Sequence, residues 1–166
     1  MNDVAYEAMN KRTFPGYGHW IEQGATVTWE FWNGRSSRNH PMFGGGLNWF
    51  YRTLAGVNTD ENEPGYKHII IKPQLPAKLD YVFYSNRTPY GKVISEVKKE
   101  GTNRLEMNIT VPVGSYATVY IPVSGNSVVT ESGRPVETAP GIEKTGEKNG
   151  YLTVKAVQGN YKFVVE

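Results

Sequence analysis

A glutamate between two tryptophans is the residue of this sequence best suited to chemistry. Glu30 is flanked by Trp29 and Trp32. A carboxyl group beside aromatic rings is expected to lie in a partly dry pocket, where its pKa is tuned for proton transfer. The alternative is an ordinary ion pair with Arg35 or Arg38, which would carry no function.

A histidine follows in the same segment. His40 stands in Asn39-His40-Pro41, at the end of a polar loop. A loop histidine near a glutamate can donate a hydrogen bond to a substrate hydroxyl or act as a base. The alternative is that His40 caps the helix that follows it. The three histidines, His19, His40 and His68, lack the spacing of metal ligands, so we expect neither a metal nor a cofactor.

The remaining groups of this segment favour a sugar ligand. Gly44-Gly45-Gly46 neither follows a strand nor precedes Lys-Ser/Thr, and Ser36 and Ser37 lack a Gly-x-Ser-x-Gly context, so phosphate-binding and serine-hydrolase sites are not expected. Tryptophans suit the apolar face of a sugar ring, and acidic and amide groups suit its hydroxyls. Glycoside hydrolysis typically needs two carboxylates, and only Glu30 is convincing here.

Helical spacing marks the part of the chain that carries these residues. A short helix is indicated by four residues that share one face: Val4, Ala5, Ala8 and Met9. A second helix is predicted from Met42 to Ala55. Asn39 or Pro41 is expected to open it, and Gly56 to end it.

After the polar segment NTDENEPG, period-two alternation and β-branched residues predict strands. They cover residues 66–72, 92–99, 104–111, 116–122, 151–157 and 161–165. About seven or eight strands at this spacing predict an antiparallel β-sandwich. The last two are expected to pair as a hairpin through a short Gly159-Asn160 turn. We therefore expect an α+β chain with a helical domain at 1–60 and a β-sandwich domain at 61–166.

The composition excludes several classes of protein. Net charge is +2 with scattered basic residues, which gives no electrostatic footprint for nucleic acid. No apolar run is long enough for a transmembrane helix, and no membrane partner is expected. Cysteine is absent, which excludes disulfides and thiol catalysis. The N-terminal residues lack the apolar region of a secretory signal, and the compartment, periplasmic, secreted or cytoplasmic, stays open.

Two stretches of this sequence resemble a known family. FPGYGHWIEQGATVTWEFWNG and SRNHPMFGGGLNWFYRTLAGV are similar to the last helices of the catalytic domain of bacterial α-L-rhamnosidases, glycoside hydrolase family 78. The similarity is dense over residues 14–57 and looser through PGYKHIIIKPQLP and GSYATVYIPV. It implies a few helices of an (α/α)6 barrel followed by a C-terminal β-sandwich.

The resemblance also implies an activity and a set of site residues. The activity is inverting hydrolysis of terminal α-L-rhamnose, with a rhamnose-containing glycoside or polysaccharide as substrate. Glu30 carries over as the general base and His40 as a sugar contact. Asn39, Trp29 and Trp32 match the same motifs and are expected to bind substrate.

The general acid of the family lies upstream of the matching stretch. The chain is therefore expected to be a fragment that is inactive alone, whose partner is the remainder of the catalytic domain and which can self-associate. An alternative is that the β-sandwich is a binding module, with Tyr81, Tyr84 and Tyr90 as sugar platforms. A third interpretation makes residues 66–166 purely structural.

Overall fold

The computed structural model describes residues 2–166, which contacts divide into two compact units. The first ends at Phe50 and also includes Pro76–Lys78; the second comprises Tyr51–Leu75 and Leu79–Glu166. The sequence pattern placed the change at residues 60 and 61. Within residues 2–166, no helix is long and apolar enough to cross a membrane.

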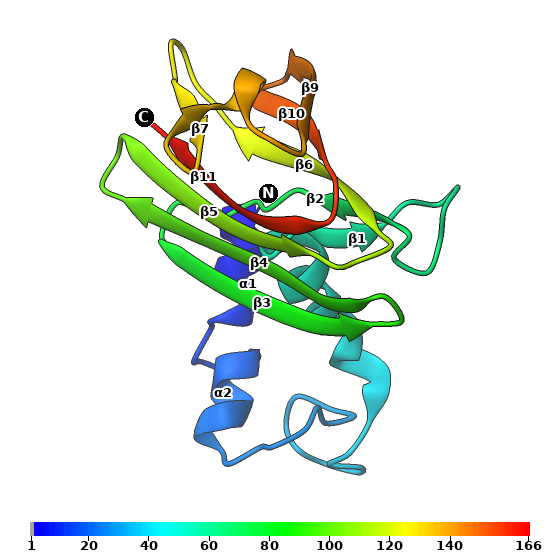
Figure 1. Cartoon of the computed structure of the whole chain (residues 1–166). Helices are drawn as coiled ribbons and strands as arrows, with labels where there is room; N and C mark the ends of the chain where they lie inside the picture. Colours follow the sequence, from blue (N-terminus) through cyan, green and yellow to red (C-terminus); the bar gives the residue numbers. More distant parts are fainter. Residues whose placement is uncertain (1) are drawn as a thin grey trace. The chain divides into compact units, whose positions relative to one another are not determined.

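The first unit contains short helices joined by a long irregular segment (Figure 1). Helix α1 spans Asn2–Met9, as predicted, and α2 spans Tyr17–Glu22. A run of helical turns begins at Pro41, one of the two predicted openings. It consists of the 3-10 helix η1 (Pro41–Gly46), α3 (Leu47–Trp49) and the π-helix η2 (Phe50–Leu54), whose last four residues belong to the second unit.

The prediction of one regular helix over residues 42–55 was wrong. Three consecutive glycines have low helix propensity, and the run begins as a tight 3-10 helix. A Cβ atom on Gly46 would lie 2.7 Å from the Tyr17 hydroxyl oxygen, so a side chain there does not fit. Gly56 follows the run with φ +70°, as expected of a residue that ends a helix.

The second unit is a sandwich of two sheets (Figure 1). The five-stranded sheet has the order β1-β2-β6-β10-β9, and the six-stranded sheet has the order β3-β4-β5-β11-β7-β8. The strands are β1 (Val57–Thr59), β2 (His68–Ile71), β3 (Tyr81–Thr88), β4 (Gly91–Glu100), β5 (Arg104–Val111), β6 (Tyr116–Pro122), β7 (Val129–Glu131), β8 (Arg134–Pro135), β9 (Ile142–Lys148), β10 (Tyr151–Ala156) and β11 (Gly159–Val165). A 3-10 turn, η3, spans Val136–Thr138.

All six strands that the alternation predicted are present, and the sandwich is confirmed. The structure has eleven strands rather than seven or eight, and β2 and β6 pair in parallel. Strand β9 was missed because its sequence, IEKTGEK, has no alternating apolar face, and its residues are almost all exposed. Strand β3 was missed because apolar residues at consecutive positions, Tyr81 to Tyr84, hide the alternation.

The prediction of a terminal hairpin was wrong. Strand β10 pairs with β6 and β9, whereas β11 pairs with β5 and β7 in the other sheet. The short connection at Val157-Gln158 therefore carries the chain from one sheet to the other, and both strands turn their apolar residues toward the same core. Gly159 and Asn160 begin β11 instead of forming a turn.

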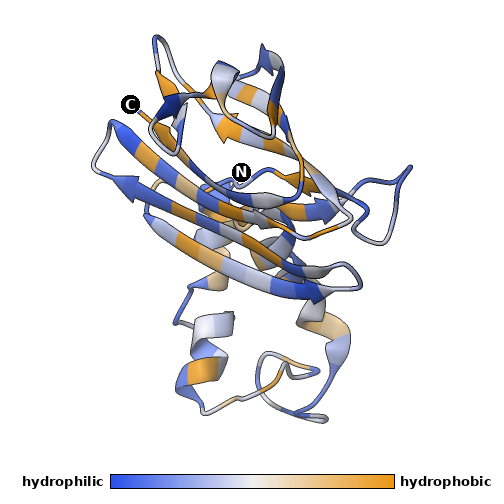
Figure 2. Cartoon of the chain, in the orientation of Figure 1, coloured by the Kyte–Doolittle hydropathy of each residue, from blue (hydrophilic) through white to orange (hydrophobic). Residues whose placement is uncertain are grey.

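The core of the second unit lies between the two sheets. Alternate residues of each long strand are buried, which Figure 2 shows as alternating hydrophobic and hydrophilic bands along the strands. Phe163 of β11 is fully buried at the centre of the six-stranded sheet. The hydroxyl of Ser95, which is fully buried, donates a hydrogen bond of 2.7 Å to the carbonyl oxygen of Ala55.

Candidate active site

The irregular segment between α2 and η1 carries Glu30 and His40 on one folded-back loop. The His40 N–H donates to the Thr28 carbonyl oxygen at 2.9 Å, and the Glu30 N–H donates to the Ser37 carbonyl oxygen at 2.9 Å. The Thr28 hydroxyl also donates to the His40 carbonyl oxygen at 2.6 Å. These bonds hold the two arms of residues 28–40, named the Glu30 loop here, side by side. Residues ten positions apart in sequence thus reach one place.

A cluster of aromatic rings supports this loop within the first unit. Trp20 is buried at its centre and stacks on Trp32, with ring centroids 4.3 Å apart. Trp29 and Phe43 contact Trp20 at 5.8 and 5.4 Å. The Trp20 indole N–H donates to the Trp32 carbonyl oxygen, and the Tyr17 hydroxyl donates to that of Phe43. Both ring packing and directed hydrogen bonds therefore fix the loop.

Trp29 is enclosed by the loop itself. Its ring is 6% exposed, and the Arg38 guanidinium lies 4.9 Å above it. Gly34 closes the turn with φ +69°, and a Cβ atom there would approach the Trp29 ring to 2.7 Å. Trp32 is partly exposed. In this unit Trp29 is thus a packing residue of the loop, and Trp32 is the tryptophan of the motif with more open surface.

The Glu30 carboxylate accepts two hydrogen bonds from the returning arm of the loop. The Ser36 hydroxyl donates to Oε2 at 2.7 Å, and the Ser37 N–H donates to the same oxygen at 3.1 Å. The Ser36 hydroxyl, and after it the Ser37 N–H, hold the pKa of Glu30 below its ordinary value; burial opposes them, and the nearby His40 adds a smaller lowering effect. Glu30 is therefore a carboxylate at neutral pH.

The surroundings of Glu30 differ from both sequence-based interpretations. Glu30 is partly exposed and held by polar groups, not enclosed in a dry aromatic pocket of this chain. Neither predicted arginine pairs with it among the described residues. The Arg35 N–H donates to the Asn33 side chain, and Arg38 donates to the Gly34 carbonyl oxygen while it covers Trp29.

His40 caps the helical run that follows, as one of its two interpretations predicted. Its Nδ1 accepts a hydrogen bond of 3.1 Å from the Met42 N–H. An imidazole that accepts at Nδ1 carries its proton on Nε2, so the capping bond leaves Nε2 as a donor. The cap therefore fixes the ring without using Nε2.

Asn39 lies next to His40 and is exposed. The Ser37 hydroxyl and the backbone of Asn39 bond to each other, the hydroxyl donating to the carbonyl oxygen at 3.0 Å. Among residues 2–166, no group bonds to the Asn39 side-chain amide. The amide is thus available to a ligand.

Ser36 and Ser37 hold the Glu30 carboxylate, and the sequence did not indicate this role. Their hydroxyls stood out only as possible nucleophiles, and no short motif links a serine to a carboxylate six or seven residues earlier. Gly34 is the one local signal, because a glycine in such a segment marks a sharp turn that returns the chain.

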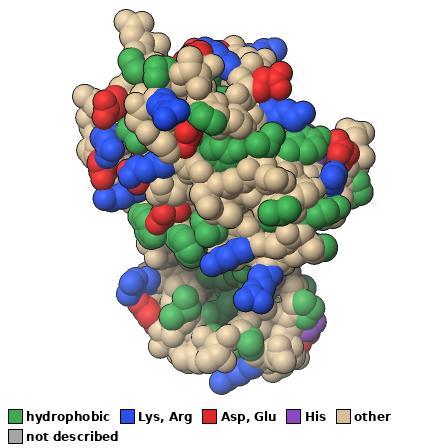
Figure 3. Space-filling model, in the orientation of Figure 1, with side chains coloured by type: hydrophobic (Ala, Val, Ile, Leu, Met, Phe, Trp, Pro, Cys, Tyr) green, Lys and Arg blue, Asp and Glu red, His purple; other side chains and the backbone are tan. Residues whose placement is uncertain are grey.

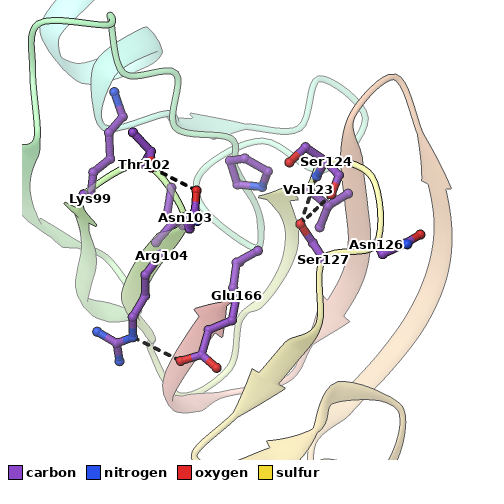
Figure 4. A pocket seen from close by; sticks show the side chains of 13 residues that line it. Lys99, Thr102, Asn103, Arg104, Val123, Ser124, Asn126, Ser127 and Glu166 are labelled. Atoms are coloured by element: carbon purple, nitrogen blue, oxygen red, sulfur yellow. Dashed lines mark hydrogen bonds and ion pairs between the residues drawn. The ribbon is translucent and has the colours of Figure 1, made fainter.

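A cavity of about 500 Å³ at one end of the second unit also has polar walls (Figure 4). The Arg104 guanidinium points to Glu166 and is also bonded to Glu100. The Ser127 hydroxyl donates to the Ser124 carbonyl oxygen. None of the 13 residues that line this cavity is aromatic or a histidine, and its one carboxylate, that of Glu166, is bonded to Arg104. Within the described residues, no group of three metal-ligating side chains occurs in either unit.

Two family models together match most of the chain. The bacterial alpha-L-rhamnosidase 6 hairpin glycosidase domain matches residues 1–54, and the bacterial alpha-L-rhamnosidase C-terminal domain matches residues 56–135. The Glu30 loop thus lies in the part that resembles the glycosidase domain. The second match begins at the glycine that ends the helical run.

Similar proteins found by sequence and similar solved structures are also alpha-L-rhamnosidases. An alpha-L-rhamnosidase of Alteromonas sp. is 32% identical over 172 residues, which cover 95% of this chain. The structure of alpha-L-rhamnosidase from Dictyoglumus thermophilum is 35% identical and superimposes with a TM-score of 0.85 over 99% of this chain. A Streptomyces avermitilis alpha-L-rhamnosidase complexed with L-rhamnose, 23% identical with a TM-score of 0.84 over 99% of this chain, shares the fold. The chain spans 18%, 19% and 16% of the lengths of these three proteins.

Proposed function

Because the chain belongs to the family of bacterial α-L-rhamnosidases, we propose that it forms part of an enzyme that cleaves terminal α-L-rhamnose from glycosides or glycans with inversion. Residues 1–60 supply one wall of the active site, and the remainder of the glycosidase domain supplies the other. The substrate is a rhamnose-containing glycoside or polysaccharide.

Glu30 is the general base in this proposal. An inverting glycosidase uses a carboxylate to take a proton from the attacking water, and an acid about 6.5–9.5 Å away to protonate the leaving oxygen. The observation that carries the assignment is the ionised Glu30 carboxylate, which Ser36 and Ser37 hold in place from the returning arm. Both bonds go to Oε2, so Oε1 is the oxygen that meets the water. Exclusion of solvent by the bound sugar is expected to raise the basicity of this carboxylate.

The sugar contacts in this proposal come from the same loop. His40 donates from Nε2 to a hydroxyl, and Asn39 bonds a second hydroxyl through its amide. Trp32 and Trp29 keep the loop in shape, and Trp32 offers the ring edge that a sugar can touch. Because the acid lies outside this chain, the chain alone releases no rhamnose in this proposal.

Proton NMR of the reaction tests the proposed function. The full-length enzyme that contains this chain is incubated with an aryl α-L-rhamnoside, and the anomeric proton of the first product is followed. β-L-rhamnose is expected first, with the α anomer appearing by mutarotation. The α anomer first would contradict inversion, and no release of rhamnose would contradict the function. The chain 1–166, assayed alone as a control, is expected to give background hydrolysis.

A further inference from the structure

The outer face of the six-stranded sheet is hollowed along the strands β4, β5 and β11. Two shallow depressions of about 410 and 540 Å³ lie there, and both are lined by Thr110 and Asn160. They adjoin at these two residues, and together they are named the sheet groove here. It lies entirely in the second unit.

Exposed aromatic rings stand at both ends of the sheet groove. Phe83 of β3 lines one depression and is 53% exposed, and Tyr90 lines the other and is 39% exposed. Phe83 lies on the outer face of its sheet, away from the core between the two sheets. An aromatic ring held in the open in this way is the platform on which the C–H face of a sugar packs.

The floor between the rings carries amide and hydroxyl groups in fixed rows. Sheet register places Thr110 of β5 directly opposite Asn160 of β11, and the Thr110 hydroxyl donates to the Asn160 side-chain oxygen at 2.7 Å. One row further, Asn108 donates to a Glu96 carboxylate oxygen at 3.0 Å. Neighbours thus orient these groups before any ligand arrives, which lowers the cost of binding.

The charges that line the sheet groove are few and of both signs. Lys162 is paired with Glu106 at 2.9 Å, and Glu96 is bonded to Asn108 and to the Tyr81 hydroxyl. Lys92 lines the other depression. Figure 3, seen from the side on which β3, β4 and β5 lie, shows basic and acidic side chains scattered over this face and not gathered by sign. An uncharged ligand therefore fits better than a polyanion or a phosphate.

We propose that the sheet groove binds a neutral oligosaccharide, with sugar rings on Phe83 and Tyr90 and hydroxyls bonded to Asn108, Thr110 and Asn160. That the sugar contains rhamnose rests on the proposed function. In this proposal the second unit has a role of its own, which is to bind the glycan. Tyr90 agrees with one of the sugar platforms considered from the sequence, whereas Tyr84 turns inward and contacts Tyr51.

A two-dimensional ¹H–¹⁵N NMR titration of the full chain tests this site. The probe is an α-L-rhamnosyl glucose disaccharide at millimolar concentration. Peak shifts are expected at the backbone amides of Asn108, Thr110 and Asn160 and at the side-chain amides of the two asparagines. Phe83→Ala is expected to weaken this binding about tenfold, which corresponds to about 1.4 kcal/mol, because it removes the stacking on one ring. Asn160→Ala is expected to weaken it severalfold.

Phe14→Ala is the matched control. Phe14 is 57% exposed in the first unit and lines neither depression of the sheet groove, so binding is expected to change less than twofold. Retained dispersion of the amide peaks confirms that each variant is folded. Shifts confined to the Glu30 loop, or no shifts at all, would overturn the sheet groove as a sugar site. Equal loss in Phe83→Ala and Phe14→Ala would overturn it as well. The anomeric NMR assay of the full-length enzyme tests the glycosidase separately.

Discussion

At the scale of single residues, the charge of Glu30 is set by two hydrogen bonds that the loop itself supplies. A carboxylate that accepts from a hydroxyl and a backbone N–H is stabilised relative to its protonated form. The lowered pKa of Glu30 therefore means that these bonds stabilise the folded loop at neutral pH. This contribution is present above the pKa of glutamate in the unfolded chain and is lost as pH falls through the lower pKa of the folded state.

Ser36→Gly removes the larger of the two causes and is expected to raise the pKa of Glu30 toward its ordinary value. Glycine is chosen because Ser36 has φ +62°, where alanine would add backbone strain. Carbon-13 NMR of the glutamate carboxyl groups across pH measures the change. Ser132→Gly is the matched control, because Ser132 also has positive φ (49°) and its hydroxyl donates to Glu131 instead. An unchanged Glu30 titration in Ser36→Gly would contradict the stated cause.

Some of this chemistry could be predicted from the sequence. Glu30 could be identified because it lies between two tryptophans, and His40 because it ends a polar loop close to it in sequence. The structure places His40 near Glu30. The serines that hold Glu30 could not be identified, because only the return of the loop makes Ser36 and Ser37 its neighbours. The expected arginine pair failed for the same reason, since the loop directs Arg38 onto Trp29.

At the scale of elements, the Glu30 loop keeps its shape because Gly34 allows the chain to pass over Trp29. Gly34→Ala is expected to destabilise the first unit by about 1–3 kcal/mol more than Gly24→Ala does, since only at Gly34 does the new methyl group overlap a ring. Both glycines have positive φ, so the backbone cost is shared and cancels. Urea unfolding followed by tryptophan fluorescence measures the difference. Equal losses in the two variants would show that the Trp29 contact does not fix the loop.

Strand β11 lies at the centre of the six-stranded sheet and carries the buried Phe163. Phe163→Ala removes a fully buried ring and is expected to cost about 3–5 kcal/mol in the free energy of unfolding. Phe83→Ala removes an exposed ring in the same sheet and is expected to change it by no more than about 0.5 kcal/mol. Guanidinium unfolding followed by far-ultraviolet circular dichroism compares them. Similar values for the two variants would contradict the placement of β11 in the core.

Local alternation predicted the long strands but not how they connect. Strands 104–111 and 116–122 agree with the structure to the residue, because one of their faces is buried and the other is not. The pairing of β10 with β11 could not be excluded from sequence, since a two-residue gap suits either a hairpin or a change of sheet. The neighbouring strands with which β10 and β11 pair determine whether the chain forms a hairpin or changes sheet. The bounds of the helical run from Pro41 were predicted to within one residue, but its helix types were not. Its glycines and proline favour turns that differ from those of a regular α-helix.

At the scale of the whole molecule, the two units differ in how they are stabilised. Among the described hydrophobic residues that are buried, only Trp20 and Trp29 belong to the first unit, whereas the second has a core of aliphatic side chains between its sheets. All four tryptophans lie in the first unit, so their fluorescence reports its unfolding alone. Fluorescence is expected to change at lower denaturant concentration than far-ultraviolet circular dichroism, which is dominated by the strands. Coincident transitions would indicate one cooperative unit.

The central claim is that Glu30 is the base that activates water, and kcat of the full-length enzyme containing Glu30→Gln tests it most directly. Glutamine keeps the size of the side chain and one acceptor oxygen but cannot accept the proton, so kcat on an aryl α-L-rhamnoside is expected to fall about 100- to 10,000-fold. Glu22→Gln is the matched control, because Glu22 is exposed and paired with Arg12, and its turnover is expected to stay near that of the unmodified enzyme. Near-normal turnover in Glu30→Gln would contradict the assignment.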